Sequence, residues 1–156
     1  MASLYDENSA VTILDDSCFV GTSENYKITK SKNKGAGFIK AYAPWCGHCQ
    51  SKVNCMNRLA GILSEFGLTV YVLDADENRV FSNTLGVRGY PSFYHVDKDG
   101  RVTGTMRTAN GEPVGQVYEI IASLCGNKRK ICEYIEANKH MMEGCDYQAP
   151  KGQGHH

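Results

Sequence analysis

The sequence lacks an excess of charge of either sign, with 17 basic and 17 acidic residues in a chain of 156. A balanced chain has neither the basic patch of a nucleic-acid binder nor an acidic tail, so nucleic acid is not an expected partner. No apolar run approaches the roughly 18 residues that span a bilayer, and a membrane is not an expected partner either. What is present is enough chain for one domain with a core of its own, and a surplus that we expect to be an extension.

Targeting signals are also missing from the sequence as given. Residues 1–7 have neither the basic nor the apolar region of a signal peptide, and the final residues, Gly154-His155-His156, are no retention signal. We therefore expect a soluble chain. Its compartment stays open between the cytosol, a trimmed secretory form and a virus-encoded or virion-associated protein.

A second metal-binding motif is absent as well. Cys46 and Cys49 have C-x-x-C spacing, but no further C-x-x-C or H-x-x-x-H supplies two more ligands, so no metal site is expected. The seven cysteines are nevertheless many for an average cytosolic chain. Because their number is odd, at least one is unpaired within a monomer.

Hydrophobic periodicity predicts alternating strands and helices. The expected strands are 11–14, 38–42, 69–73, 92–96 and 101–105, and the expected helices are 46–66, 78–85 and 114–124. Residues 15–35 are polar and indicate a loop with one helical turn. The order predicts a parallel β-α-β-α part followed by an antiparallel hairpin, which together form a central mixed sheet flanked by helices in an α/β fold. We expect one domain over residues 1–125, with its core at about 10–125, and a C-terminal helical extension and tail over 126–156.

The run Trp-Cys-Gly-His-Cys at residues 45–49 has the clearest chemical content, because it opens a helix directly after a strand. The N-terminus of a helix favours an anion, so Cys46 is the expected attacking thiolate. Cys49, one turn further on, is expected to be shielded and to resolve the mixed disulfide by attacking Cys46. His48 between them can donate to the Cys46 thiolate. A purely structural disulfide is the alternative.

The residues around this motif carry a family resemblance. Residues 41–49 (Ala-Tyr-Ala-Pro-Trp-Cys-Gly-His-Cys), 74–78 (Asp-Ala-Asp-Glu-Asn) and 86–92 (Gly-Val-Arg-Gly-Tyr-Pro-Ser) resemble the thioredoxin superfamily, and within it the catalytic domains of protein disulfide isomerases. The likeness covers roughly residues 10–125 and implies a thioredoxin fold.

The resemblance also implies roles for residues outside the cysteine pair. The Tyr90-Pro91 bond is expected to be cis and to lie against the pair, with Trp45, Gly47 and Tyr90 contacting an extended substrate; an ordinary trans turn proline is the alternative. Arg107 matches a family loop whose mobile arginine approaches the buried cysteine and favours its thiolate. A merely solvated surface arginine is the alternative there.

Lys40 is a departure from the family, which usually has a buried Glu or Asp at this position to relay protons for the second cysteine. A charged lysine cannot accept a proton. If Lys40 is buried, loss of solvation favours a neutral amine that can substitute as a base; if it reaches solvent, the relay is missing. We expect exchange steps that require deprotonation of Cys49 to be slow near neutral pH.

The remaining cysteines offer one candidate bridge. Cys125, Cys132 and Cys145 cluster near the end of the sequence, and a Cys132–Cys145 disulfide is the most plausible pairing to tie the extension back. If present, it implies an oxidising environment or an assembly particle. Cys55 is expected to be a small thiol, and Cys18 lies in the polar N-terminal stretch.

The expected function is that of a thiol-disulfide oxidoreductase of the disulfide isomerase type. Its partners are cysteine-containing protein substrates and an unidentified thiol/disulfide redox partner, and no cofactor is required. A general thioredoxin-type reductase is the first alternative, although Gly47-His48 argues against it. A binding or chaperone-like module that keeps the cysteines only as a clamp is the second, with the C-terminal helix as its partner surface.

Overall fold

The computed structural model describes residues 4–7, 9–47, 53–126 and 128–145. Its elements, in chain order, are β1 (Thr12–Leu14), η1 (Asp16–Cys18), β2 (Phe19–Val20), β3 (Lys27–Ile28), β4 (Gly37–Tyr42), α2 (Val53–Ser64), β5 (Thr69–Asp74), α3 (Arg79–Leu85), β6 (Ser92–Val96), β7 (Val102–Thr105), α4 (Val117–Cys125), α5 (Arg129–Ala137) and η2 (Lys139–Met142).

The main sheet has the strand order β1-β5-β4-β6-β7. β1 and β4 both run parallel to β5, whereas β6 is antiparallel to β4 and β7 is antiparallel to β6. The predicted mixed sheet is confirmed, and the thioredoxin-type α/β architecture with it. The parallel strands come from the helix-connected first part of the chain, and the antiparallel pair comes from the tight turn at Gly100, whose φ is 87°.

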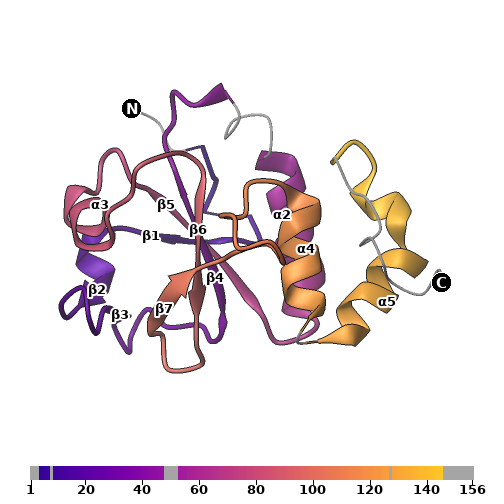
Figure 1. Ribbon diagram of the computed structural model, residues 1–156, viewed down its shortest axis with the longest axis horizontal. Helices are drawn as coiled ribbons and strands as arrows, with labels where there is room; N and C mark the ends of the chain where they lie inside the picture. The colour runs from indigo at the N-terminus through magenta and orange to yellow at the C-terminus, as the bar shows by residue number, and fades with distance from the viewer. Residues whose placement is uncertain (1–3, 8, 48–52, 127, 146–156) are drawn as a thin grey trace.

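The two faces of the sheet are covered by different elements (Figure 1). Side chains alternate along a strand, so Phe38, Lys40 and Tyr42 of β4 share one face while Ile39 and Ala41 share the other. α2 and α4 cover the first face and α3 covers the second, as Figure 1 shows. Two buried clusters follow this division, one with Phe38 and Tyr42 and the other with Ile39 and Ala41.

Two local predictions differ from the structure. The polar stretch 15–35 contains the expected helical turn, η1, but also the small antiparallel hairpin of β2 and β3, whose two-residue strands are too short to leave a periodic pattern. The last helix of the predicted core begins at Val117 and not at Val114, because the Val114 N–H donates to the carbonyl of Met106 at 2.9 Å in an extended connection. Gln116 then caps the helix through a reciprocal bond with Glu119.

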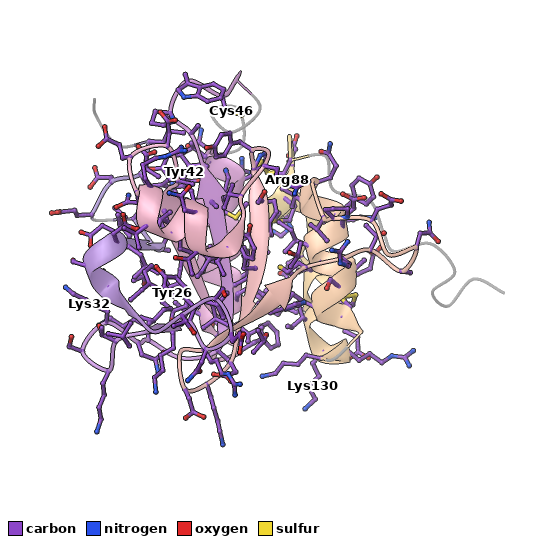
Figure 2. All side chains as sticks on the ribbon, turned by 60° about the vertical axis from the view of Figure 1, so that its left-hand side comes forward. Tyr26, Lys32, Tyr42, Cys46, Arg88 and Lys130 are labelled. Carbon is purple, nitrogen blue, oxygen red and sulfur yellow. A yellow bond between two sulfur atoms is a disulfide. The ribbon has the colours of Figure 1, made fainter. Side chains whose placement is uncertain are left out.

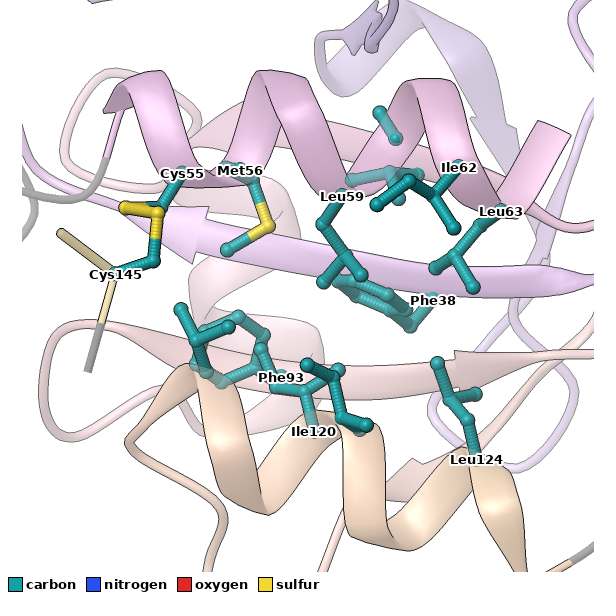
Figure 3. Close-up of a cluster of buried hydrophobic side chains, with 14 of the residues drawn as sticks. Phe38, Cys55, Met56, Leu59, Ile62, Leu63, Phe93, Ile120, Leu124 and Cys145 are labelled. Carbon is teal, nitrogen blue, oxygen red and sulfur yellow. A yellow bond between two sulfur atoms is a disulfide. The ribbon is translucent and has the colours of Figure 1, made fainter. Parts of the chain in front are cut away.

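The C-terminal helix is present as α5, followed by the short η2, and both pack beside α2 and α4. Figure 3 shows the cluster of buried apolar side chains between α2, the sheet and α4. Ile131 and Ile135 of α5 and Met142 of η2 are buried in this same cluster. The extension therefore adds to the core of the domain and is not a separate appendage.

Two disulfides fasten the extension, and the predicted Cys132–Cys145 pairing is wrong. Cys132 is bonded to Cys125, with a sequence separation of 7, because the turn after α4 folds α5 back against it. Cys145 is bonded to Cys55, 90 residues away, since η2 packs against α2 and the residues after η2 reach the first turn of that helix. Figure 3 shows the two cysteines side by side. The expectation that Cys55 is a thiol is also wrong, because its sulfur is in this disulfide.

Polar contacts reinforce this attachment along the length of α2. The guanidinium of Arg58 donates to the carbonyl oxygens of Met141 and Glu143 at 3.1 and 2.9 Å. Past the other end of the helix, the ammonium of Lys128 donates to the carbonyl of Phe66 at 3.2 Å, and the ring of Phe66 meets Tyr134 edge-on at 5.6 Å. Charge-assisted hydrogen bonds are about twice as strong as neutral ones, so these contacts hold the extension at both ends of α2.

Within the described part of the chain, no helix has the length and apolar character needed to cross a membrane.

Candidate functional site

Cys46 lies just beyond the carboxyl end of β4, at the edge of the molecule. Its backbone N–H donates to the carbonyl of Ala43 at 3.0 Å, which closes a turn, and the helix begins at the next residue, Gly47. Cys46 is half-buried, whereas Tyr42 beneath it is buried (Figure 2). The sulfur thus has a face toward solvent and stands at the start of a helix.

Pro91 lies beside this cysteine, as the sequence predicted. The Tyr90-Pro91 peptide bond is cis. The carbonyl oxygen of Tyr90 lies 3.9 Å from the Sγ of Cys46, within the range of a weak sulfur hydrogen bond. The loop before β6 therefore presents backbone atoms to the reactive sulfur, although 44 residues separate the two in sequence.

Trp45 forms the exposed rim of the site. Its side chain is 59% exposed, yet the indole N–H donates to the carboxylate of Asp76 at 3.1 Å. Its ring also meets Tyr90 edge-on, with 5.5 Å between the ring centroids. An exposed aromatic ring held from two sides offers a preorganised apolar surface next to Cys46.

The Asp76 carboxylate is itself held in place by Asp74 at the end of β5. One oxygen of Asp74 accepts hydrogen bonds from the backbone N–H groups of Asp76 and Glu77, both at 3.0 Å. Burial raises the pKa of Asp74 above its ordinary value, while these two backbone bonds act in the opposite direction. β4 and β5 are parallel, so their carboxyl ends bring Trp45 and this acidic turn to one edge of the sheet.

Lys40 is fully buried under the site. Among the described residues it is the only charged side chain that is buried, with 0% of its surface exposed. Its Nζ donates to the hydroxyl of Tyr5 at 2.8 Å. Of the two alternatives for Lys40, the buried one is correct.

Arg107 lies in the loop after β7 with its side chain exposed. Its guanidinium donates to the carbonyl of Gly111 at 2.9 Å, within the same loop. His48 and Cys49 lie outside the described residues, so the predicted approach of Arg107 to Cys49 stays a prediction, as do the roles of His48 and Cys49.

Sequence reasoning missed two residues of this neighbourhood. Asp76 could have been identified from the sequence, because it follows β5, and β5 runs parallel to β4, the strand that leads into the motif. Tyr5 had none, because residues 4–7 form no regular element and show no periodicity. In the described ranges, no group of three or more His, Cys, Asp or Glu side chains could hold a metal ion.

The comparisons with known proteins agree on one family. A family model described as Thioredoxin matches residues 17–123. Protein disulfide-isomerase 1 of Caenorhabditis elegans is 33% identical over 129 residues, which cover 81% of this chain and 26% of the relative. Protein disulfide-isomerase like 2-2 of Arabidopsis thaliana is 32% identical over 90 residues, 58% of this chain and 20% of the relative. The chain thus spans about a quarter or less of the length of these curated relatives.

Among solved structures, the long form of thioredoxin f from spinach chloroplast is 21% identical. The match covers 83% of this chain and 86% of that one, with a TM-score of 0.48.

Proposed function

The chain belongs to the thioredoxin family, and on this premise we propose that it is a thiol-disulfide oxidoreductase of the disulfide isomerase type, acting on protein cysteines. The observation that supports the proposal best is the placement of Cys46. Its half-exposed sulfur stands at a helix start and faces the carbonyl oxygen that precedes cis-Pro91. The relatives with printed isomerase names are longer proteins, so isomerisation itself is part of the proposal.

The proposed reaction proceeds through a mixed disulfide. The Cys46 thiolate attacks one sulfur of a substrate disulfide, forms a new S–S bond to it, and expels the other substrate sulfur as a thiolate. Cys49 then attacks the Cys46 sulfur, which releases the second substrate thiol and leaves the motif oxidised. Two electrons pass from the motif to the substrate, and the reverse sequence oxidises a substrate dithiol. No cofactor is needed in either direction.

The surroundings of Cys46 suggest how an extended substrate binds. A substrate strand laid along the loop before β6 can donate a backbone N–H to the Tyr90 carbonyl, while the ring of Trp45 covers an apolar side chain. Gly47 is exposed, and a Cβ at this position would meet no atom of the described residues within 4 Å, so we propose that substrate passes close to the backbone there. We propose Trp45, Gly47 and Tyr90 as the substrate-contacting residues.

The test separates the proposal from its two rivals. The purified chain is assayed for reduction of a protein disulfide by an added dithiol, and for recovery of activity by a substrate protein with scrambled disulfides in a glutathione buffer. We expect turnover in both assays. Turnover in the reduction assay alone identifies a general thioredoxin-type reductase, and an inert wild type identifies a binding or chaperone-like module.

Lys40 gives a kinetic prediction. A carboxylate can accept and return a proton at this position, whereas the buried Lys40 can do so only as a neutral amine. The hydrogen bond of its Nζ to the Tyr5 hydroxyl, and its place over the Tyr5 ring, favour the charged form instead. We therefore expect Lys40→Glu to raise the exchange rate near neutral pH by about tenfold, which is less than the roughly hundredfold or more of a fully positioned general acid-base catalyst. Stopped-flow turnover of both proteins across pH measures this, with Lys98→Glu on the exposed turn before β7 as the matched control. A Lys40→Glu rate no higher than the wild-type rate would refute the missing-relay hypothesis.

A further inference from the structure

The burial of the Lys40 side chain requires a physical explanation. A lysine ammonium removed from water loses several kcal/mol of solvation unless partners replace the lost hydrogen bonds, as a general estimate for buried ions. Lys40 is opposite Val72 of β5 and Phe93 of β6 in the sheet, so apolar residues flank it on both neighbouring strands. Its Nζ therefore depends on polar atoms supplied from outside the sheet.

Tyr5 supplies one of those polar atoms. Its hydroxyl accepts a hydrogen bond from the Lys40 Nζ at 2.8 Å, and the Nζ lies 5.4 Å from the centroid of the Tyr5 ring. A hydroxyl oxygen and the face of an aromatic ring both favour the charged form of an amine. Tyr5 thus offsets part of the cost of keeping a positive charge in this place.

Tyr5 is itself firmly placed. Only 4% of its surface is exposed, and its ring meets Tyr42 of β4 edge-on at 5.4 Å. It comes from the N-terminal segment, before residue 17, where the match to the family model begins. One partner of this contact therefore lies outside the part of the chain that the family model matches.

Lys40 and the reactive sulfur border the same apolar cluster. Lys40 belongs to the face of β4 that also carries Phe38 and Tyr42, and both of these lie in the apolar cluster against which Cys46 packs. A positive charge acts over a longer distance in such a medium than in water, and it lowers the free energy of a nearby thiolate. The dithiol form of the motif contains the thiolate and the disulfide form does not.

We propose that Tyr5 is a positioning residue for the exchange reaction, which holds the Lys40 ammonium against the apolar cluster that also packs on Cys46 and thereby favours the dithiol form of the motif. The inference rests on the proposed function. It concerns the equilibrium between the two forms, whereas the Lys40→Glu prediction concerns a rate: an ammonium stabilises a thiolate once formed but accepts no proton during its formation.

The test measures the equilibrium of the motif with glutathione. Two glutathione thiols reduce the Cys46–Cys49 disulfide and leave oxidised glutathione, with two electrons and two protons passing to the motif. Trp45 is the single tryptophan of the chain and adjoins Cys46, so its fluorescence reports this couple separately from the other two disulfides. The equilibrium constant for reduction is obtained from fluorescence over a series of glutathione ratios.

We expect Tyr5→Phe to decrease this constant about threefold and Lys40→Met to decrease it about tenfold, because interactions of one charge with a thiolate are of this order. Tyr5→Phe keeps the ring that packs on Tyr42, so the fold is expected to be retained. Tyr134→Phe on α5 and Lys98→Met on an exposed turn are the matched controls and are expected to equal the wild type. Absorbance of the thiolate at neutral pH gives a second readout, expected to fall in Tyr5→Phe.

Each outcome is decisive. A decrease in Tyr5→Phe and Lys40→Met, with unchanged controls, supports the inference. If the wild-type motif equilibrates with glutathione and Tyr5→Phe has the same constant or a higher one, the inference is overturned and the proposed function stands. If the wild-type motif does not equilibrate with glutathione at all, the proposed function fails and the inference fails with it.

Discussion

Cys46→Ser is expected to lower disulfide reduction and isomerisation at least about a thousandfold, because loss of a catalytic nucleophile typically costs that much or more. A serine hydroxyl is not ionised near neutral pH and forms no disulfide, so neither the attack on substrate nor the mixed disulfide is possible. The half-buried position of Cys46 accepts the smaller oxygen without strain, and the variant is expected to unfold at the wild-type temperature.

The matched control is Cys18→Ser. Cys18 is buried in the other hydrophobic cluster, on the α3 side of the sheet, and forms no disulfide. Its replacement is expected to leave turnover unchanged. Steady-state rates of wild type and both variants with one disulfide substrate decide the matter: activity in Cys46→Ser close to the wild-type rate would contradict the assignment of the nucleophile.

The second large effect concerns stability and the two disulfides. Loop-closure entropy predicts that the Cys55–Cys145 bond, which spans 90 residues, stabilises the fold by about 4.5 kcal/mol. The same relation gives about 2.5 kcal/mol for Cys125–Cys132, which spans 7 residues. At roughly 2–4 °C per kcal/mol for a chain of this size, the double alanine variants lose roughly 9–18 °C and 5–10 °C in Tm, respectively.

Calorimetry of the two double variants without reductant checks this prediction. The pairs are well matched, because all four cysteines are buried in one cluster and the substitutions remove equal numbers of atoms. The longer loop is expected to show the larger loss. Equal losses, or a larger loss for Cys125→Ala/Cys132→Ala, would mean that the extension is held by its apolar and polar contacts and not by the long-range bond.

The fold was predictable where periodicity is strong. The apolar residues of α2 repeat at helix spacing, and those of β4 and β5 form short buried runs of strand length. Gly86 and Gly100, both with positive φ, end α3 and close the turn between β6 and β7. β2 and β3 were missed because two residues cannot establish a period. The C-terminal helix was predictable as an element, but its contacts with α2 were not.

The cysteine pairing shows why a sequence-based prediction of long-range contacts fails. Cys125, Cys132 and Cys145 cluster in the sequence, and a Cys132–Cys145 bridge was expected because it would tie the extension back. In the structure α5 folds back on α4, which brings Cys132 to Cys125, and η2 then passes over α2, which brings Cys145 to Cys55. The choice of partner depends on how the helices pack, which the spacing of residues along the sequence does not indicate.

The site was predictable to a similar extent. Cys46, Trp45 and Pro91 could be identified because a motif combines them with a strand end and a cis proline. The burial of Lys40 could not be decided, since a lysine on a strand can either be covered or reach solvent. Its contact with Tyr5 depends on where an irregular N-terminal segment lies, and no pattern in that segment indicates its position.

The Cys55–Cys145 bond also determines how the chain responds to mechanical force. It closes a covalent ring that contains β5, α3, β6, β7, α4 and α5, while β4 and Cys46 precede the ring. Tension applied between Tyr5 and Cys145 runs through residues 5–55 and then crosses directly to Cys145 through the two sulfur atoms. The ring cannot be extended while that bond is intact, so a molecule pulled between these two residues lengthens only by the chain before Cys55 and keeps the length of the ring in reserve.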